Sequence, residues 1–315
     1  MSSVPPPSDP ASWAPSDHRP DRTGSVASVN PRFDTVSFLS DFGHGDEFVG
    51  VVHSVIRSIA PHVAVIDVTH GIAPHDTRAG GLALARAANY LCPGVVVAVV
   101  DPGVGTARRP IAIEVGDGAS YLVGPDNGLL APAVGLVGGA TRAVELVSPD
   151  HRLDAAGGST FDGRDVFAPA AAHLCNGVPI TDLGPEIDPA GLMPGILPVS
   201  QIEGETLVCE VLWVDRFGNC QLNVDPLELA AFGELLSVTI SGDERVGIRA
   251  DAYDDIPTGR VGLVVDSSGL LSVAAARTSA AAEFGLGEGD EVRISTLADG
   301  TNPGVVTPVE LGRRP

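Results

Sequence analysis

The chain has 315 residues, of which 44% are hydrophobic and 19% are charged, and its formal net charge at pH 7 is −21. This length favours two domains, and the negative charge argues against a nucleic-acid partner because a phosphate backbone needs a basic face. The basic side chains are all Arg and none is Lys. Lysine chemistry is therefore excluded, including Schiff bases, pyridoxal phosphate and phosphate-binding loops of the Walker type.

The first 33 residues are rich in Pro and Ser and lack the basic start and apolar core of a signal peptide. Apolar runs elsewhere are interrupted by Gly, Pro or charge before they reach membrane-spanning length. We expect a disordered tail over 1–33, no membrane partner and a cytoplasmic location.

Strands and helices alternate from Asp34 onward. DTVSFLS is typical of a strand, and a helix is predicted from Glu47 to Ala60 because apolar residues recur on one face. HVAVIDV is a second strand, Asp76 is suited to cap a second helix that runs toward Leu91, and GVVVAVV is a third strand buried on both faces. This succession predicts parallel strands with right-handed crossovers.

The following segments predict a hairpin from PIAIEVG and SYLVG, a short helix after GPDNGLL, a strand in TRAVELV and a helix from Arg164 to about Cys175. Prolines and the lack of any period mark 181–203 as a linker between 34–180 and 204–312. Five strands are predicted in the second domain: ETLVCEVLWVD, CQLNV, LLSVTIS, RVGLVVDS and LLSVAAA. The predicted fold class is an α/β N-terminal domain with a central, mostly parallel sheet, plus a smaller all-β, barrel-like or sandwich C-terminal domain.

The cysteines and histidines do not form a metal-binding or disulfide pattern. The four cysteines lie far apart, which predicts small buried apolar residues. The histidines form no HExxH motif, and their closest pair, His70 and His75, straddles a turn. No metal site is predicted.

Carboxylates follow each of the first three strands. Asp41, Asp67 and Asp101 therefore fall at the same edge of the predicted sheet. Ligands bind open parallel sheets at this edge, where loops bring polar groups together. The pattern is compatible equally with a small-molecule site and with three unrelated loop caps.

Three motifs contain candidate site residues, and each also has a structural interpretation. In DPGVGTARR, Asp101 can pair with Arg108 or Arg109, either to hold the turn or to orient a water molecule. In STFDGRDVF, Asp162 or the Asp three residues later suits the N-terminus of a helix. VLWVDRFGNCQLNV has a tight Phe-Gly turn that suits either core packing or a cradle for a purine and an ammonium group.

Taken together, the motifs resemble those of the S-adenosyl-L-methionine (SAM) hydrolases that form adenosine. These enzymes are also called SAM hydroxide adenosyltransferases, and they are related to fluorinase and chlorinase. The motifs SDFG, DVTH, DPGVGT, PDNGLL, STFxGRDxFAPAAA and VDxFGN occur in the family's order, within a resemblance that covers about 35–295. It implies an α/β domain and a β-barrel-like domain, assembled as a homotrimer with the substrate at the subunit interface.

The resemblance implies nucleophilic substitution at the ribose C5′ of SAM, in which water displaces L-methionine and adenosine forms. Because the sulfonium leaves as a neutral thioether, no cofactor or metal is expected and SAM is the substrate. By this resemblance, Asp101 and Arg108 are two of three residues that activate the water, although Arg109 remains an alternative. The substrate contacts that it implies are Asp41 for the ribose diol, Asp215 for the methionine ammonium, Phe217 and Asn219 for adenine, and Ser267 or Ser268 for the methionine carboxylate.

The third water-activating residue of the family is a His, and Asp162 replaces it here. A carboxylate can accept a hydrogen bond from water, and it would repel a halide ion. DPGVGTARRP also runs directly into the next strand, without room for the extra loop of the halogenating relatives. The sequence therefore predicts a hydrolase. The alternatives are a SAM or adenosine binding or sensing protein without turnover and, less favoured, a SAM-dependent halogenase.

Overall fold

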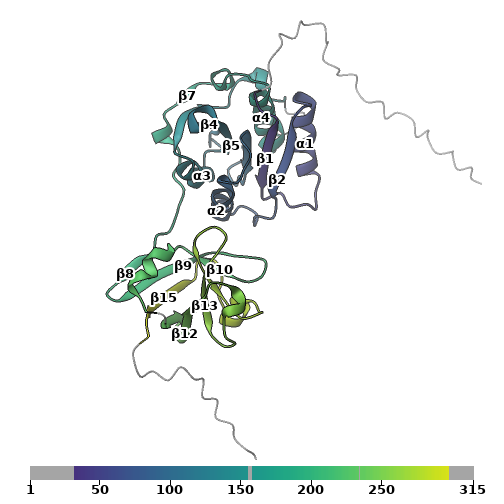
Figure 1. Cartoon of the computed structure of the whole chain (residues 1–315). Helices are drawn as coiled ribbons and strands as arrows, with labels where there is room; N and C mark the ends of the chain where they lie inside the picture. Colours follow the sequence, from purple (N-terminus) through teal and green to yellow (C-terminus); the bar gives the residue numbers. More distant parts are fainter. Residues whose placement is uncertain (1–31, 155–157, 234, 298–315) are drawn as a thin grey trace, which may run out of the picture.

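The computed structural model describes residues 32–154, 158–233 and 235–297 (Figure 1). The predicted tail lies outside the described residues apart from Arg32 and Phe33, whose backbone N–H groups donate to the carbonyl of Cys175 at 2.9 and 3.3 Å. Residues 298–312 of the predicted second domain also lie outside the described part. No described helix combines the length and apolar character that crossing a membrane requires.

A seven-stranded sheet forms the centre of the N-terminal domain. In sheet order its strands are β2 (Ala64–Thr69), β1 (Thr35–Ser40), β3 (Val95–Val99), β5 (Ser120–Pro125), β4 (Pro110–Val115), β6 (Ala140–Glu145) and β7 (Glu186–Ile187). The first four strands are parallel to one another and the last three are antiparallel to their neighbours. The predicted parallel core and the β4–β5 hairpin are confirmed, and β7 adds an edge strand from the predicted linker.

Helices cover both faces of this sheet (Figure 1). Helices α1 (Phe48–Ile59) and α4 (Ala168–Cys175) pack together on one face, and α2 (Thr77–Ala88) and α3 (Ala131–Leu136) pack together on the other. Asp76 caps α2 as predicted, because its carboxylate accepts from Ala79 N at 2.8 Å. The first domain is therefore a three-layered α/β structure.

The buried face of α1 differs from the predicted apolar face, which included Phe48 and did not include Val49. Val49, Val52 and Ile56 are buried, and each contributes about 1.5–3 kcal/mol through burial. Phe48 was expected on the same apolar face but is 37% exposed, and it lines a cavity at the end of the sheet. The start of α1 therefore contributes to a site rather than to the core.

The C-terminal domain is a barrel of seven strands, closed by pairing of β10 with β9. An eighth strand, β8, pairs only with β9, and the parallel pair β12–β13 is the exception to the antiparallel pattern. The strands are β8 (Gln201–Glu203), β9 (Thr206–Val214), β10 (Cys220–Leu222), β11 (Leu235–Ile240), β12 (Asp243–Arg249), β13 (Val261–Val265), β14 (Leu271–Ala274) and β15 (Glu291–Thr296). The predicted all-β domain is confirmed as a barrel, with β12 and β15 in addition to the five predicted strands.

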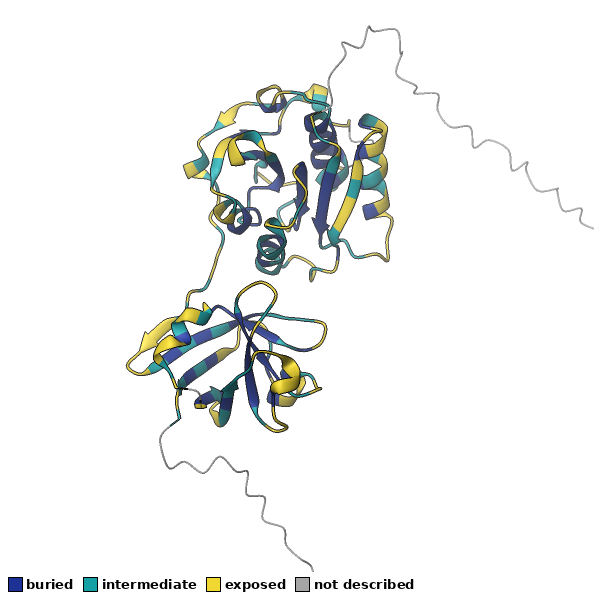
Figure 2. Cartoon of the chain, viewed as in Figure 1, coloured by how far each residue is buried: buried dark blue, intermediate teal, exposed yellow. Residues whose placement is uncertain are grey.

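Short helical turns complete the fold. They are α5 (Ala280–Phe284), η1 (Gly116–Gly118), η2 (Pro149–His151), η3 (Gly163–Phe167), η4 (Ile180–Leu183), η5 (Pro189–Gly191), η6 (Pro226–Ala231) and η7 (Tyr253–Asp255). Buried apolar residues pack on both faces of the N-terminal sheet and inside the barrel, and Figure 2 shows most of the central strands in dark blue.

Three of the four cysteines are buried as expected, namely Cys175, Cys209 and Cys220, whereas Cys92 is exposed. Burial raises the pKa of each buried thiol to about 12, so these three behave as small apolar side chains.

The two domains contact each other through α2 and β9. Arg78 Nη2 lies 2.5 Å from Glu210 Oε1, and the guanidinium of Arg86 lies 4.1 Å from the centroid of the Trp213 ring. An ion pair and a cation–π contact thus join the barrel to one face of the α/β domain.

Candidate functional site

A cavity of about 260 Å³ opens at the carboxyl ends of β1 and β3. Asp41 follows β1 and Asp101 lies two residues after β3, so the parallel pairing of these strands brings both carboxylates to one edge. The lining residues are Asp41, Phe42, Phe48, Pro74, His75, Val99, Asp101, Val104, Thr160, Phe161, Asp162 and Gly163. Asp41 and Asp101, two of the three aspartates expected at this edge, thus line one cavity, and Asp162 lines it with them.

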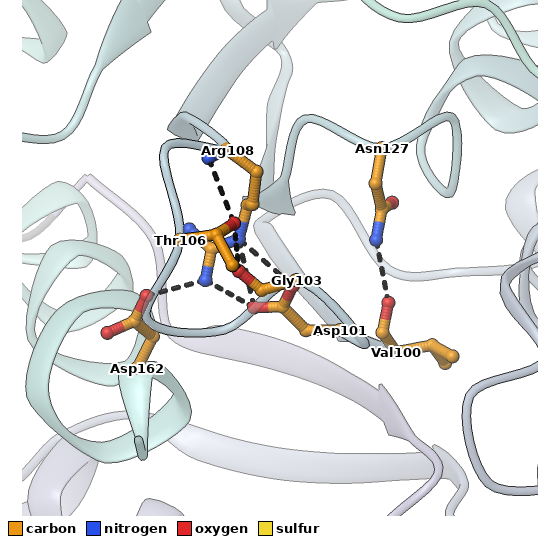
Figure 3. A network of polar contacts seen from close by, with 7 residues as sticks. All are labelled: Val100, Asp101, Gly103, Thr106, Arg108, Asn127 and Asp162. Atoms are coloured by element: carbon orange, nitrogen blue, oxygen red, sulfur yellow. Dashed lines mark hydrogen bonds and ion pairs between the residues drawn. The ribbon is translucent and has the colours of Figure 1, made fainter. Parts of the chain in front are cut away.

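Arg108 joins two of these carboxylates (Figure 3). Its Nε donates to Asp101 Oδ1 and Oδ2 at 3.0 Å each, and its Nη2 donates to Asp101 Oδ2 and, at 2.5 Å, to Asp162 Oδ2. The guanidinium also lies 5.4 Å from the centroid of the Phe167 ring. Three side chains from two segments that are far apart in sequence thus form one connected cluster, called the Asp-Arg-Asp cluster below.

The Asp-Arg-Asp cluster is well shielded from solvent. The exposed fractions of the Asp101, Arg108 and Asp162 side chains are 5%, 11% and 15%. Burial alone would lower the pKa of Arg108, but its contacts with Asp101 and Asp162 outweigh burial and raise that pKa. Two carboxylates share one permanent cation, so the cluster presents a negative potential to the cavity.

Arg109 lies in a different environment. Its Nε and Nη2 donate to Asp126 Oδ2 at 2.9 and 2.5 Å, and Nη2 also donates to the carbonyl of Gly191 at 2.7 Å. Of the two adjacent arginines, the structure therefore brings Arg108 to the cavity carboxylates and pairs Arg109 with another aspartate.

Two polar residues that the sequence analysis did not assign hold this loop in place. Thr106 Oγ1 donates to the carbonyl of Gly103 at 2.7 Å, and Asn127 Nδ2 donates to the carbonyl of Val100 at 2.9 Å (Figure 3). The second bond fixes the backbone immediately before Asp101. Asn127 belongs to the PDNGLL motif, so this motif could have identified it as a site residue from the sequence.

Asp162 precedes the π-helical turn η3. Its carboxylate makes no capping hydrogen bond and instead reaches Arg108, which removes the structural alternative for this residue. Asp165 is buried and accepts from Arg164 Nε at 2.7 Å and Nη2 at 2.8 Å. A Cβ on Gly163 would come within 3.0 Å of Phe161 and 3.1 Å of Phe42, so a glycine keeps the turn close to the cavity wall.

Asp41 and an aromatic wall form the rest of the cavity. Asp41 Oδ2 accepts from His75 N at 2.8 Å, which orients this carboxylate. The rings of Phe42, Phe48 and Phe161 pack against one another with centroids 5.0 to 5.7 Å apart. These three rings were not among the site residues predicted from the sequence, although Phe42 and Phe161 lie in the motifs SDFG and STFDGRD.

Asp67 does not line the cavity with the other strand-end aspartates. Its Oδ1 lies 2.8 Å from His53 Nε2 and 3.0 Å from His70 Nε2. Burial would raise the pKa of Asp67, but the contacts with His70 and His53 outweigh burial and lower it. Of the three aspartates predicted at this edge of the sheet, Asp41 and Asp101 line the cavity, whereas Asp67 contacts two histidines outside it.

The predicted adenine and ammonium contacts share one turn between β9 and β10. Asp215 Oδ1 accepts from the backbone N–H groups of Phe217 and Asn219, and Oδ2 accepts from Asn219 Nδ2, each at 2.8 Å. Gly218 has φ +84, and a Cβ there would lie 2.0 Å from Ser279 Oγ, so the turn requires glycine. Phe217 is 78% exposed, which leaves its ring free to contact a ligand.

Ser267 and Ser268 lie on the exposed turn between β13 and β14. The β10–β14 register pairs Cys220 with Val273 and Gln221 with Ser272, which puts this serine turn and the Asp215 turn at opposite ends of the pair. Among the described residues, no hydrogen bond or ion pair joins either turn to the cavity. The predicted site residues thus fall into three separate groups within one chain.

Another cleft, of about 280 Å³, lies between β4 and α3 and is lined mostly by apolar side chains. Its carboxylate, Asp126, already accepts from Arg109 and from Met193 N at 2.8 Å. The cavity beside the Asp-Arg-Asp cluster offers more polar groups for chemistry and is the better candidate site.

Comparison with known proteins supports this choice. The chain is 45% identical over 260 residues to a protein of Salinispora arenicola named (R)-S-adenosyl-L-methionine hydrolase, covering 82% of this chain and 97% of the relative. A crystal structure of an uncharacterized conserved protein from Thermotoga maritima has a TM-score of 0.76 and 32% identity, covering 82% of this chain and 99% of that one. Both matches extend over the two domains.

A fluorinase of Actinopolyspora mzabensis is more distant, with 27% identity over 290 residues that cover 82% of this chain and 96% of the relative. The SAM hydroxide adenosyltransferase N-terminal domain model matches 36–184, and the corresponding C-terminal domain model matches 209–293. These ranges contain the Asp-Arg-Asp cluster and the Asp215 turn, respectively. The chain therefore belongs to the SAM hydroxide adenosyltransferase family.

Proposed function

We propose that this protein hydrolyses SAM to adenosine and L-methionine by attack of water at the ribose C5′. The observation that carries the proposal is the Asp-Arg-Asp cluster, which holds two carboxylates at the wall of the cavity next to Asp41. The hydrolase name of the relative that is 45% identical supports the same reaction.

SAM is expected to enter with its ribose against Asp41. The carboxylate is already oriented by His75 N, and a carboxylate can accept hydrogen bonds from both ribose hydroxyls. The negative Asp-Arg-Asp cluster and the faces of the neighbouring phenylalanines attract the cationic sulfonium. The ribose contact and the sulfonium contact together fix C5′ between them.

The reaction is a direct substitution. A lone pair of water forms the C5′–O bond while the electron pair of the C5′–S bond leaves with sulfur as neutral methionine. The attacking water then carries the positive charge and passes one proton to a cavity carboxylate, Asp101 or Asp162, and from there to solvent. No cofactor is needed because the sulfonium is an activated leaving group.

The chain contributes alignment and proton acceptance. Asp162 and Asp101 accept hydrogen bonds from water and direct its lone pair toward C5′, while Arg108 holds both carboxylates at fixed positions. The same carboxylates repel a halide ion, so water rather than chloride or fluoride is the expected nucleophile.

We also propose that the active unit is a homotrimer in the cytoplasm. The exposed Phe217 ring and the Asp215 turn make no polar contact with the cavity of their own chain within the described residues. In a ring of subunits, the turn of one protomer can cover the cavity of its neighbour through a heterologous interface. The adenine, ammonium and carboxylate contacts predicted for Phe217, Asn219, Asp215 and Ser267 or Ser268 would then come from the partner.

The test is incubation of purified protein with SAM, followed by chromatographic measurement of adenosine and methionine, with and without added chloride or fluoride. We expect equimolar adenosine and methionine and no 5′-halo nucleoside. Tight SAM binding without turnover would instead identify a binding or sensing protein, and a 5′-halo product would identify a halogenase.

A further inference from the structure

Two histidines and an aspartate converge beside the cavity without lining it. His53 comes from α1, Asp67 from β2 and His70 from the loop directly after β2. One ligand atom from each residue, His53 Nε2, Asp67 Oδ1 and His70 Nε2, lies within 4.8 Å of the other two. These three residues are called the His-Asp-His cluster below.

The imidazole of His70 presents a buried nitrogen, Nε2, to Asp67 in this cluster. Its side chain is fully buried, and its Nδ1 lies 2.7 Å from Ser40 Oγ. Its Nε2 is buried without a hydrogen-bond partner among the described residues, although Asp67 Oδ1 is only 3.0 Å away. A buried nitrogen without a partner costs free energy, so an additional group at this position would stabilise the fold.

We propose that His53, Asp67 and His70 bind a divalent transition-metal ion of the zinc type. Two imidazole nitrogens and one carboxylate oxygen are a common ligand set for such ions. Metal–ligand bonds of about 2.0–2.2 Å in tetrahedral geometry separate the ligand atoms by roughly 3.3 Å. The present separations of 2.8 and 3.0 Å are slightly shorter, so a small rotation of the side chains makes room for the ion.

The surroundings of the His-Asp-His cluster suit this role. Ser40 Oγ can accept from His70 Nδ1–H, which leaves the lone pair of Nε2 directed at the ion, as second-shell partners of metal-bound histidines commonly do. The side chains of His53 and Asp67 are 31% and 39% exposed, so water can complete the coordination and the ion can exchange with solvent. β2 is one of the two edge strands of the sheet, and Figure 2 shows it as exposed over part of its length.

A bound ion would join α1 to β2 next to the loop that carries Asp41. The carbonyl of His70 accepts from Gly43 N at 2.8 Å, which links the His-Asp-His cluster to that loop. None of the three ligands lines the cavity, so the ion has a structural role and does not take part in the proposed substitution.

The test uses full-length, untagged protein that has been treated with EDTA and desalted. Titration with Co²⁺, followed by visible absorption, and with Zn²⁺, followed by calorimetry, measures binding directly. We expect about one ion per chain, tetrahedral Co²⁺ bands and a higher Tm with Zn²⁺. His53→Gln and Asp67→Asn remove one ligand each and should weaken Co²⁺ binding by at least about tenfold.

The matched control is His62→Gln, which removes an exposed imidazole just beyond the end of α1 and should leave Co²⁺ binding unchanged. Circular dichroism and Tm without metal show whether each variant is folded. The proposal is overturned if the wild-type protein gives neither Co²⁺ bands nor a saturable Zn²⁺ titration. It is also overturned if His53→Gln and His62→Gln bind Co²⁺ equally well.

Discussion

The guanidinium of Arg108 forms ion pairs with two carboxylates, those of Asp101 and Asp162. It contacts Asp101 through two nitrogens and Asp162 through one, whereas Arg109 is paired with Asp126. The sequence did not distinguish these two arginines, because adjacent residues in an irregular loop can point in either direction. The backbone of the Gly103–Arg108 turn, held by Thr106, makes the distinction.

Exchanging each arginine in turn tests this assignment. Arg108→Ala should lower kcat by roughly 100-fold, because the water-orienting carboxylates lose their common partner. KM for SAM should change little, because Arg108 does not line the cavity. Steady-state kinetics of adenosine release at several SAM concentrations separate the two constants.

Arg109→Ala is the matched control. It leaves the 3% exposed carboxylate of Asp126 without its cation, so Tm should fall while kcat stays within about twofold of wild type. Equal kcat for Arg108→Ala and wild type would remove Arg108 from the mechanism.

Asp162 is the residue that departs from the family pattern. If its role is to accept a hydrogen bond from water, a neutral imidazole can replace it, and Asp162→His should keep kcat within about tenfold of wild type. Asp162→Ala removes the acceptor and should lower kcat by roughly 100-fold. Parallel kinetics of the two variants give the comparison, and an alanine variant as active as wild type would contradict the role.

At the scale of elements, helix α4 carries a histidine that is kept neutral. Burial, with a smaller contribution from nearby His151, lowers the pKa of His173 to about 4. An unfolded histidine has a pKa of about 6.5, so between these values the unfolded chain binds a proton that the folded chain does not. Folding stability must therefore fall as the pH drops from about 6.5 toward 4.

His173→Gln removes this proton uptake. We expect the loss of Tm between about pH 7 and about pH 5 to be smaller in His173→Gln than in wild type, as measured by differential scanning calorimetry. His62→Gln, at an exposed position, should keep the wild-type dependence. An unchanged pH dependence in His173→Gln would show that His173 is not the group responsible.

Element prediction succeeded where the hydrophobic pattern is strong. The runs of β1 and β3 and the capped helix α2 were predicted from periodicity and from Asp76, and the structure confirms them. Strands β12 and β15 were missed because charged residues interrupt them: Asp243, Glu244, Arg245 and Arg249 in β12, and Glu291 and Arg293 in β15. β12 pairs with one side of β11 and β15 pairs with the other, and this pairing stabilises both strands. Local sequence does not show which strands will become neighbours.

At the scale of the whole molecule, the sequence predicted contacts between site residues only where the order of the strands is enough to bring those residues together. Parallel strand order was sufficient to predict that Asp41 and Asp101 meet, because both follow adjacent strands. The position of Asp67 in the His-Asp-His cluster depends on α1 packing over β2, which strand order does not specify. The Asp215 turn lies in the other domain and makes no polar contact with the cavity within the described residues, so its part in the site depends on the proposed assembly.

Mixing two impaired variants tests that assembly. Arg108→Ala should lower kcat by releasing the two cavity carboxylates, and Phe217→Ala should raise KM by roughly tenfold through loss of base stacking. If each site combines two chains, randomly mixed trimers have both halves intact at about a quarter of their sites. At low SAM concentration the co-expressed mixture should then exceed the average activity of the two separate variants. Activity equal to that average would locate the whole site within one chain.

The central claim is that water attacks C5′, and the origin of the new oxygen tests it most directly. Hydrolysis of SAM in H₂¹⁸O, followed by mass spectrometry of the products, should give adenosine with one ¹⁸O at the 5′ position and unlabelled methionine. Adenosine that forms without ¹⁸O at this position, or protein that binds SAM and releases no adenosine, would contradict the proposed function.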